Sequence, residues 1–143
     1  MMRFMMLVRA SKESETGALP SKELLVAMGQ FNEEMVKAGV LIAGDGLQPS
    51  SKGTRVTFSG AKRTFTDGPF AETKELLAGF WMIDVKSKAD AVAWASRVPF
   101  RDGEVIEVRQ VFEAEDFPAE VFPPEEVARE ERLRAELQRR AKR

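Results

Sequence analysis

The chain contains no histidine, no cysteine and no tyrosine. The missing cysteines exclude disulfides and cysteine nucleophiles, and the missing histidines exclude serine–histidine triads. Together the two absences exclude zinc sites built on these residues and haem held by them. The ionisable side chains that remain titrate far from pH 7 in water. Acid–base chemistry would therefore require a carboxyl or lysine group whose pKa is shifted by burial.

An excess of charge of one sign and long apolar runs are also missing. The 143 residues include 22 basic and 23 acidic ones, which provides no electrostatic footprint for nucleic acid or an anionic membrane. No apolar run approaches the ~20 residues that span a bilayer. The early apolar segment 4–8 is too short for the hydrophobic region of a signal peptide. We therefore expect a cytoplasmic protein without membrane or direct nucleic-acid partners.

The hydrophobic periodicity predicts an α+β domain. Strands are expected at 4–8, 40–43, 55–59, 63–66, 79–85 and 104–111, and helices from the cap Ser21 to Gly39 and from the cap Ser87 to Pro99. Residues 10–20 are expected to form a polar loop, and residues 55–66 an inserted β-hairpin. Without the hairpin the order is βαββαβ, so we predict a ferredoxin-like fold with helices on one face of the sheet.

The last predicted strand carries apolar residues on both of its faces. One face has Ile106 and Val108, and the other has Val105, Glu107, Arg109 and Val111. We therefore expect a homodimer formed sheet to sheet, which would enclose Glu107 and Arg109 near the interface. The alternative is a solvated face on which these two side chains form a pair of opposite charge. Arg109 within a strand needs either Glu107 or an anionic ligand as its partner.

The segment 118–143 differs in character from the predicted domain 1–117. Prolines interrupt its first residues, and a highly charged helix is expected from Glu125 onward. This helix has too few large apolar residues for a sustained coiled coil. The segment is expected to be either a solvated extension or a contact element for another chain.

The strongest local signal is the ten-residue segment TDGPFAETKE, residues 66–75. Asp67, Gly68 and Pro69 form a turn, because aspartate bonds its own backbone, glycine permits unusual dihedrals and proline rigidifies the exit. We expect the turn to hold Phe70 as a plug against the core. A carboxylate fixed beside a rigid aromatic ring is a candidate acid or base. The alternative is that Asp67 only caps the turn.

Other acidic residues give weaker signals. Asp45 lies between Gly44 and Gly46, where it could present a carboxylate and free amides to a ligand or simply form a turn. Asp45, Asp67 and Glu72 could supply oxygen ligands, but no loop has the spacing of a known Mg²⁺ or Ca²⁺ site. We therefore predict neither a metal site nor a cofactor.

Three segments carry a resemblance to a known family. These are VLIAGDGLQPS, TDGPFAETKELLAGFWMIDV and GEVIEVRQV, at residues 40–50, 66–85 and 103–111. They resemble the DGPF-domain branch of the YCII-related proteins, over roughly residues 1–113. The resemblance implies a dimeric α+β barrel, with ferredoxin-like protomers joined through their sheets. It also implies association with extracytoplasmic-function sigma factors, beside which members of this branch often occur.

The resemblance also assigns roles to residues. Asp67 is the functional position of the motif, and Gly68, Pro69 and Phe70 are its scaffold. The wider group has a proposed histidine–aspartate pair, which a chain without histidine cannot form. Trp81 stands where relatives commonly have tyrosine, so a pocket there would be more apolar.

Two functions from different classes follow from these observations. The first is binding of an unknown small molecule in a cleft of a homodimer, with Asp67 as general acid or base, Phe70 and Trp81 as an apolar wall and Arg109 as anion-binding residue. Gly68 and Asp45 would contribute to the same ligand site. The second is a non-catalytic interaction module beside a sigma factor, with the charged tail as contact element. The absence of a side chain that titrates near neutrality favours binding over catalysis.

Overall fold

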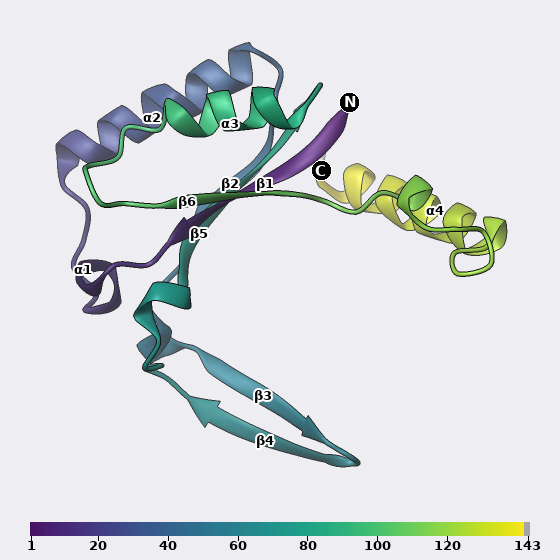
Figure 1. The fold of residues 1–143 in the computed structure, drawn as a ribbon, viewed down its shortest axis with the longest axis horizontal. Helices are drawn as coiled ribbons and strands as arrows, with labels where there is room; N and C mark the ends of the chain where they lie inside the picture. Colours follow the sequence, from purple (N-terminus) through teal and green to yellow (C-terminus); the bar gives the residue numbers. More distant parts are fainter. Residues whose placement is uncertain (142–143) are drawn as a thin grey trace. The chain divides into compact units, whose positions relative to one another are not determined.

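The computed structural model describes residues 1–141, and the chain divides into two compact units, Met1–Val111 and Phe112–Arg143. The first unit contains the strands and helices of the α+β domain (Figure 1). In chain order they are β1 Met2–Arg9, α1 Lys12–Glu15, α2 Lys22–Lys37, β2 Leu41–Gly46, β3 Thr54–Ser59, β4 Lys62–Asp67, β5 Leu77–Val85, α3 Lys88–Ser96 and β6 Ile106–Gln110. The predicted domain limits at residues 117 and 118 stay a prediction.

The sheet confirms the predicted ferredoxin-like plan. Its four strands lie in the order β2-β5-β1-β6, and every neighbouring pair is antiparallel. Helices α2 and α3 lie on one face of this sheet, and its other face has no helix of this unit on it (Figure 1). We call this second face the open face. Strands β3 and β4 form a separate two-stranded sheet, the predicted hairpin.

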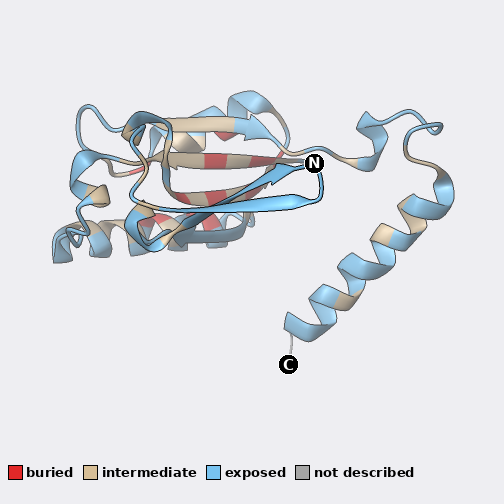
Figure 2. Ribbon diagram, turned by 90° about the horizontal axis from the view of Figure 1, so that it is seen from below, coloured by how far each residue is buried: buried red, intermediate tan, exposed pale blue. Residues whose placement is uncertain are grey.

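The core lies between the sheet and the two helices, where the buried parts of the central strands are seen in Figure 2. Phe4, Met6 and Ile83 of the sheet meet Phe31 and Met35 of α2 there, and all five are at most 4% exposed. The spacing of the apolar residues in α2 predicted this contact face. Helix α2 begins as expected, because the Ser21 hydroxyl accepts the Leu24 N–H at 3.1 Å.

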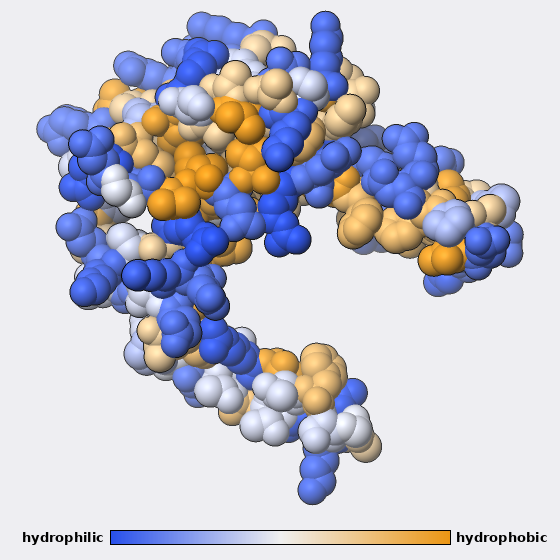
Figure 3. All heavy atoms as spheres, viewed as in Figure 1, coloured by the Kyte–Doolittle hydropathy of each residue, from blue (hydrophilic) through white to orange (hydrophobic). Residues whose placement is uncertain are grey.

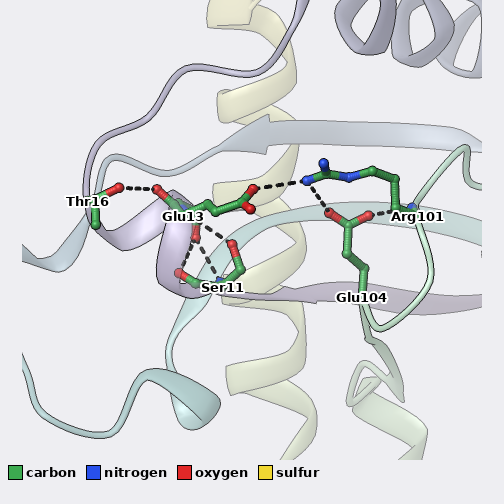
Figure 4. Close-up of polar contacts among 6 residues, drawn as sticks. Ser11, Glu13, Thr16, Arg101 and Glu104 are labelled. Atoms are coloured by element: carbon green, nitrogen blue, oxygen red, sulfur yellow. Dashed lines mark hydrogen bonds and ion pairs between the residues drawn. The ribbon is translucent and has the colours of Figure 1, made fainter.

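The structure corrects the prediction that residues 10–20 form a loop. They contain the one-turn helix α1, because Ser11 and Ser14 exchange hydrogen bonds between side chain and backbone at 2.9 and 3.0 Å. Glu13 of α1 forms an ion pair with Arg101 at 3.1 Å, which ties the short helix to the loop before β6 (Figure 4).

Strand β2 is longer than the predicted segment 40–43. It continues to Gly46, so Asp45 lies in a strand opposite Phe80 rather than in a turn. The strand can pair this far with β5 because residue 44 is a glycine. A Cβ atom at Gly44 would lie only 2.7 Å from Cδ1 of Trp81 on β5. The glycine here allows the large indole ring to lie against the backbone of β2, which the chain pattern alone did not indicate.

The second unit contains helix α4, Pro124–Ala141, which confirms that the tail is helical. Ahead of the helix, the Phe117 ring contacts the tilted ring of Phe112 at a centroid distance of 5.0 Å and meets Phe122 edge to face at 5.9 Å. Residues 142 and 143 of the predicted tail lie outside the described residues. Among residues 1–141, no helix is long and apolar enough to cross a membrane.

Candidate functional site

The open face of the sheet has an apolar centre. Met5 and Leu7 of β1 are paired with Met82 and Phe80 of β5. Side chains alternate between the two faces of a strand, so these four point away from the side of Met6 and the helices. All four are half-buried in the single chain. A continuous group of large apolar side chains on a sheet face that no helix of the first unit covers is typical of an interaction surface.

A cluster of charges borders this apolar centre, and we call it the open-face charge cluster: Arg9, Glu107 and Arg109. The Arg9 guanidinium donates to Glu107 at 2.9 Å and to the backbone carbonyl of Lys74. Glu107 pairs with Leu7 across the strands, which places its carboxylate next to the apolar centre. The predicted contact of Arg109 with Glu107 is present at 3.8 Å.

Arg109 has capacity for a further partner. Its contact with Glu107 is longer than a direct hydrogen bond, and 71% of its side chain is exposed. Two guanidinium groups face one carboxylate in the cluster, so its net charge is positive. A guanidinium can bind a carboxylate or phosphate with two parallel hydrogen bonds. The arrangement can therefore bind an anionic group beside an apolar surface.

Asp45 shares the open face with this cluster. It lies opposite Phe80, and Phe80 lies opposite Leu7, which lies opposite Glu107. These four residues therefore form one row across the sheet, with Asp45 on the edge strand β2 and Glu107 on the edge strand β6. The structure thus brings Asp45 and Arg109 onto one face, at opposite edges.

Trp81 lies on the other face of the sheet. It is 7% exposed, and its ring meets Phe31 edge to face at a centroid distance of 5.6 Å. Its indole N–H donates to the side-chain carbonyl of Asn32 in α2 at 2.8 Å. The sheet therefore separates Trp81 from Asp45 and Arg109, and its visible contacts are those of a core residue.

Asp67 lies at the end of the hairpin. It is the last residue of β4, pairs with Thr54 and accepts the hydrogen of the Thr54 hydroxyl at 2.7 Å. Asp67 is exposed. The contact holds the two strands together where they meet the rest of the domain. The predicted role of Asp67 as acid or base stays a prediction.

Phe70 is not the predicted plug of the core. It is half-buried, and its ring lies under the guanidinium of Arg55 with the carbon of that group 3.8 Å from the ring centroid. The prediction was wrong because the hairpin carries the motif beyond the sheet, so an arginine of β3 covers the ring in place of the helices.

The residues that hold the motif were missed by the sequence reasoning. Ser50 is the centre of these contacts: its N–H donates to the Glu15 carboxylate at 2.8 Å and its hydroxyl donates to the other oxygen of that carboxylate. The same hydroxyl accepts the N–H of Phe70 at 3.1 Å. Gly68 lies against this turn so closely that a Cβ atom would be 1.8 Å from the Ser50 carbonyl oxygen. No local pattern links positions 15 and 50.

These contacts change the acidity of Glu15. The hydrogen bond from the Ser50 hydroxyl, followed by the one from the Ser50 N–H, lowers the pKa of Glu15 below its usual value of 4.5, and burial opposes this slightly. A pKa lowered by folding means that the contact stabilises the fold above the unfolded-state pKa. The stabilisation is lost as the pH falls through the folded-state pKa.

We therefore expect Glu15→Gln to destabilise the protein more at neutral pH than in acid. The free energy of unfolding should fall by about 1 kcal/mol at pH 7, the scale of one partly exposed hydrogen bond to a charged group. The difference from wild type should shrink at an acidic pH below the folded-state pKa of Glu15, where the wild-type carboxyl is protonated as well. Urea unfolding at both pH values measures it. Glu13→Gln, which removes a surface ion pair, is the matched control, and an equal loss at both pH values would contradict the assignment.

A groove of about 400 Å³ is lined by Val40, Val85, Trp94 and Arg97 among others, and none of the predicted site residues lies in it. Within residues 1–141, no group of three or more aspartate or glutamate side chains could hold a metal ion.

The fold and the open face together define a class of protein, the α+β domain whose four-stranded sheet has helices on one side only. The model of the YCII-related domain family matches residues 2–115, and the chain belongs to this family, whose members are typically dimeric α+β barrels. An uncharacterised protein of Rhizobium meliloti (strain 1021) is similar to it. The two are 34% identical over 86 residues, which cover 58% of this chain and 69% of the relative.

Proposed function

We propose that the protein is a homodimer that binds a small molecule with an apolar body and an anionic group between the two open faces. The observation that carries this proposal is the open-face charge cluster, in which Arg109 lies in one row with Met5 and Met82 and has guanidinium donors available for a ligand. Dimerisation through the sheets would enclose this cluster. Removal of water strengthens the attraction between a guanidinium and an anion, because the local dielectric falls.

Binding, rather than catalysis, is the function that the geometry favours. A general acid or base works best when its pKa lies near the working pH. Asp67 is exposed and bonded to Thr54, which supports a role in holding the hairpin. On the open face, Arg9 and Arg109 both contact Glu107, an arrangement that can orient an anionic ligand.

The experiment uses anilinonaphthalene sulfonate, a fluorescent aromatic sulfonate, as probe. We expect a dimeric mass by light scattering at micromolar concentration and saturable probe binding. Arg109→Gln should weaken the binding about tenfold, the loss of one charge-assisted contact. Arg101→Gln, at a surface arginine paired with Glu13, should leave it unchanged within about twofold. A monomeric mass, or equal binding by the Arg109 and Arg101 variants, would refute the proposal.

The alternative of a sigma-factor partner predicts a different result. Deletion of residues 118–143 would then abolish capture of the sigma factor and leave the dimer intact. The charge of α4 is carried by ion pairs within the helix, such as Glu130 with Arg134 at 2.7 Å and Glu136 with Arg140 at 3.2 Å. These internal pairs do not favour a partner, so we retain small-molecule binding as the proposed function.

A further inference from the structure

The β3–β4 hairpin has one apolar and one polar face. Val56 pairs with Phe65, and Phe58 lies two residues from Val56 on the same face. The opposite face carries Arg55, Thr57, Ser59, Lys62, Thr64 and Thr66. Such an alternation is typical of strands that bury one face against another layer.

Within residues 1–111, no such layer covers the apolar face. Every residue of both strands is exposed, and Phe58 and Phe65 are 70% and 69% exposed. The guanidinium of Arg63, which lies opposite Phe58 on the neighbouring strand β4, covers part of the Phe58 ring at 4.4 Å from the ring centroid. A two-stranded ribbon with both faces in water is marginally stable at best. The three apolar side chains therefore indicate a surface that a partner covers.

The base of the hairpin is held firmly. Gly68 donates its N–H to the Gly53 carbonyl at 3.0 Å, and Ser50 joins this base to Glu15 and to Phe70. Arg55 stacks on the Phe70 ring at the same end. The β3–β4 hairpin therefore projects from the domain on a fixed base. We call the hairpin the arm and its base, at Gly53 and Gly68, the root.

The position of the arm indicates which molecule covers its apolar face. It leaves the sheet after β2 and returns into β5, and it extends beneath the open face in Figure 1 and across that face in Figure 2. Figure 3 shows apolar atoms at its surface, next to the hollow between the arm and the sheet. A second protomer that covers the open face would enter this hollow. The apolar face of the arm therefore lies beside the surface proposed for dimerisation.

The distribution of charge also favours a second copy of this chain as the partner of the arm. Residues 54–67, which form the arm, include three basic residues and one acidic residue. The remainder of residues 1–111 contains twelve basic and thirteen acidic residues. In the proposed dimer, a positively charged arm on one protomer would meet a body of small net negative charge on the other, and the two arms would repel each other. Such complementarity fixes the register of an interface.

We propose that the hairpin is a dimerisation arm, which packs Val56, Phe58 and Phe65 against the body of a second copy of this chain. This inference rests on the proposed homodimer and adds to it a second contact surface outside the sheets. In a dimer of this kind, the sheet of the second protomer covers the open-face ligand site, and the arm closes its side.

The test is the dimer dissociation constant by sedimentation equilibrium. The variant Val56→Thr/Phe58→Thr/Phe65→Thr keeps residues suited to strands and removes the apolar face. Its dissociation constant should rise at least about thirtyfold, because buried aromatic side chains dominate interface energies. The control Thr57→Ser/Thr64→Ser/Thr66→Ser alters the opposite face of the same strands and should change it less than about threefold. An unchanged constant in the apolar-face variant, with the hairpin folded by circular dichroism, overturns the inference.

A second variant separates this inference from the proposed function. Met82→Lys places a charge in the centre of the open face and leaves the arm untouched. If Met82→Lys dissociates the dimer and the arm variant does not, the sheet interface stands and the arm inference fails. If only the arm variant dissociates it, the arm stands and the sheet interface fails. A wild type that is monomeric throughout refutes both.

The absence of cysteine allows a direct readout. Phe58→Cys introduces the single thiol of the chain, to which an environment-sensitive dye can be attached. Its emission should shift to the blue as the protein concentration passes through the dimer dissociation constant. An emission that stays constant over this range overturns the inference, because the label then remains in water in the dimer.

Discussion

Alanine at Gly68 should lower the free energy of unfolding by about 2–3 kcal/mol, the range for overpacking at a tight contact. The added Cβ atom would lie 1.8 Å from the carbonyl oxygen of Ser50 and 2.6 Å from its carbonyl carbon. Both are backbone atoms, so no side-chain rotation can relieve the clash. The turn at Ser50 must move, and the hydrogen bonds that it makes with Glu15 and Phe70 must lengthen or break.

Gly29→Ala is the matched control for this prediction. Gly29 lies in helix α2, and a Cβ atom there meets nothing within 4 Å. Alanine should therefore stabilise the helix by about 0.5–1 kcal/mol. Urea unfolding followed by tryptophan fluorescence measures both variants. Hydrogen exchange at the Phe70 amide shows whether the loss is local to the motif. A Gly68→Ala variant as stable as wild type would mean that the glycine is not required at this contact.

The effect should extend to the arm. Gly68 and its neighbours form the root of the hairpin, where the Gly68 N–H bonds to Gly53 across the two strands. A displaced root changes the direction of the whole ribbon. We thus expect the glycine of the motif to matter for dimerisation even though it lies outside both proposed interfaces.

Most of the fold could be predicted from local patterns. Helix α2 follows from one apolar stripe and its serine cap, and the hairpin follows from alternation around Gly60. The end of β2 could not be predicted, because it depends on Trp81 lying over Gly44 from the neighbouring strand. Helix α1 was missed because two serines, rather than a hydrophobic stripe, stabilise it.

Less of the candidate site could be predicted. Alternation placed Glu107 and Arg109 on one face of the last strand, and the structure shows their contact. Arg9 was missed because it lies where the register of β1 shifts. Its contact with Glu107 therefore does not follow from the alternation of side chains along the strand. The partnership of Glu15 with Ser50 spans 35 positions and depends wholly on tertiary structure.

The face of Trp81 could not be predicted for a different reason. The segment 79–85 is apolar at nearly every position, so alternation does not distinguish the two faces of β5. Trp81 was therefore predicted to form one apolar wall together with Phe70. In the structure Trp81 points to the helices, and it is Phe80 that occupies the open face.

Trp81→Ala should cost about 3–5 kcal/mol in the free energy of unfolding, as for large aromatic residues removed from a packed core. The cavity would open between β5 and α2, and the Asn32 carbonyl would lose the indole N–H as its donor. Trp81→Phe keeps an aromatic ring against Phe31 and should cost about 1–2 kcal/mol, mainly for the lost hydrogen bond and the smaller volume. Urea unfolding gives both values.

Phe80→Ala is the matched control, one position earlier in the same strand and on the opposite face. Phe80 is half-buried, so its loss should cost the single protomer less than the loss of Trp81. Phe80→Ala should instead weaken the dimer and the binding of anilinonaphthalene sulfonate, while Trp81→Phe retains both. The opposite result, in which Trp81→Phe loses the probe at unchanged stability, would place Trp81 at the ligand after all. The pair of variants therefore decides which face of β5 carries the function.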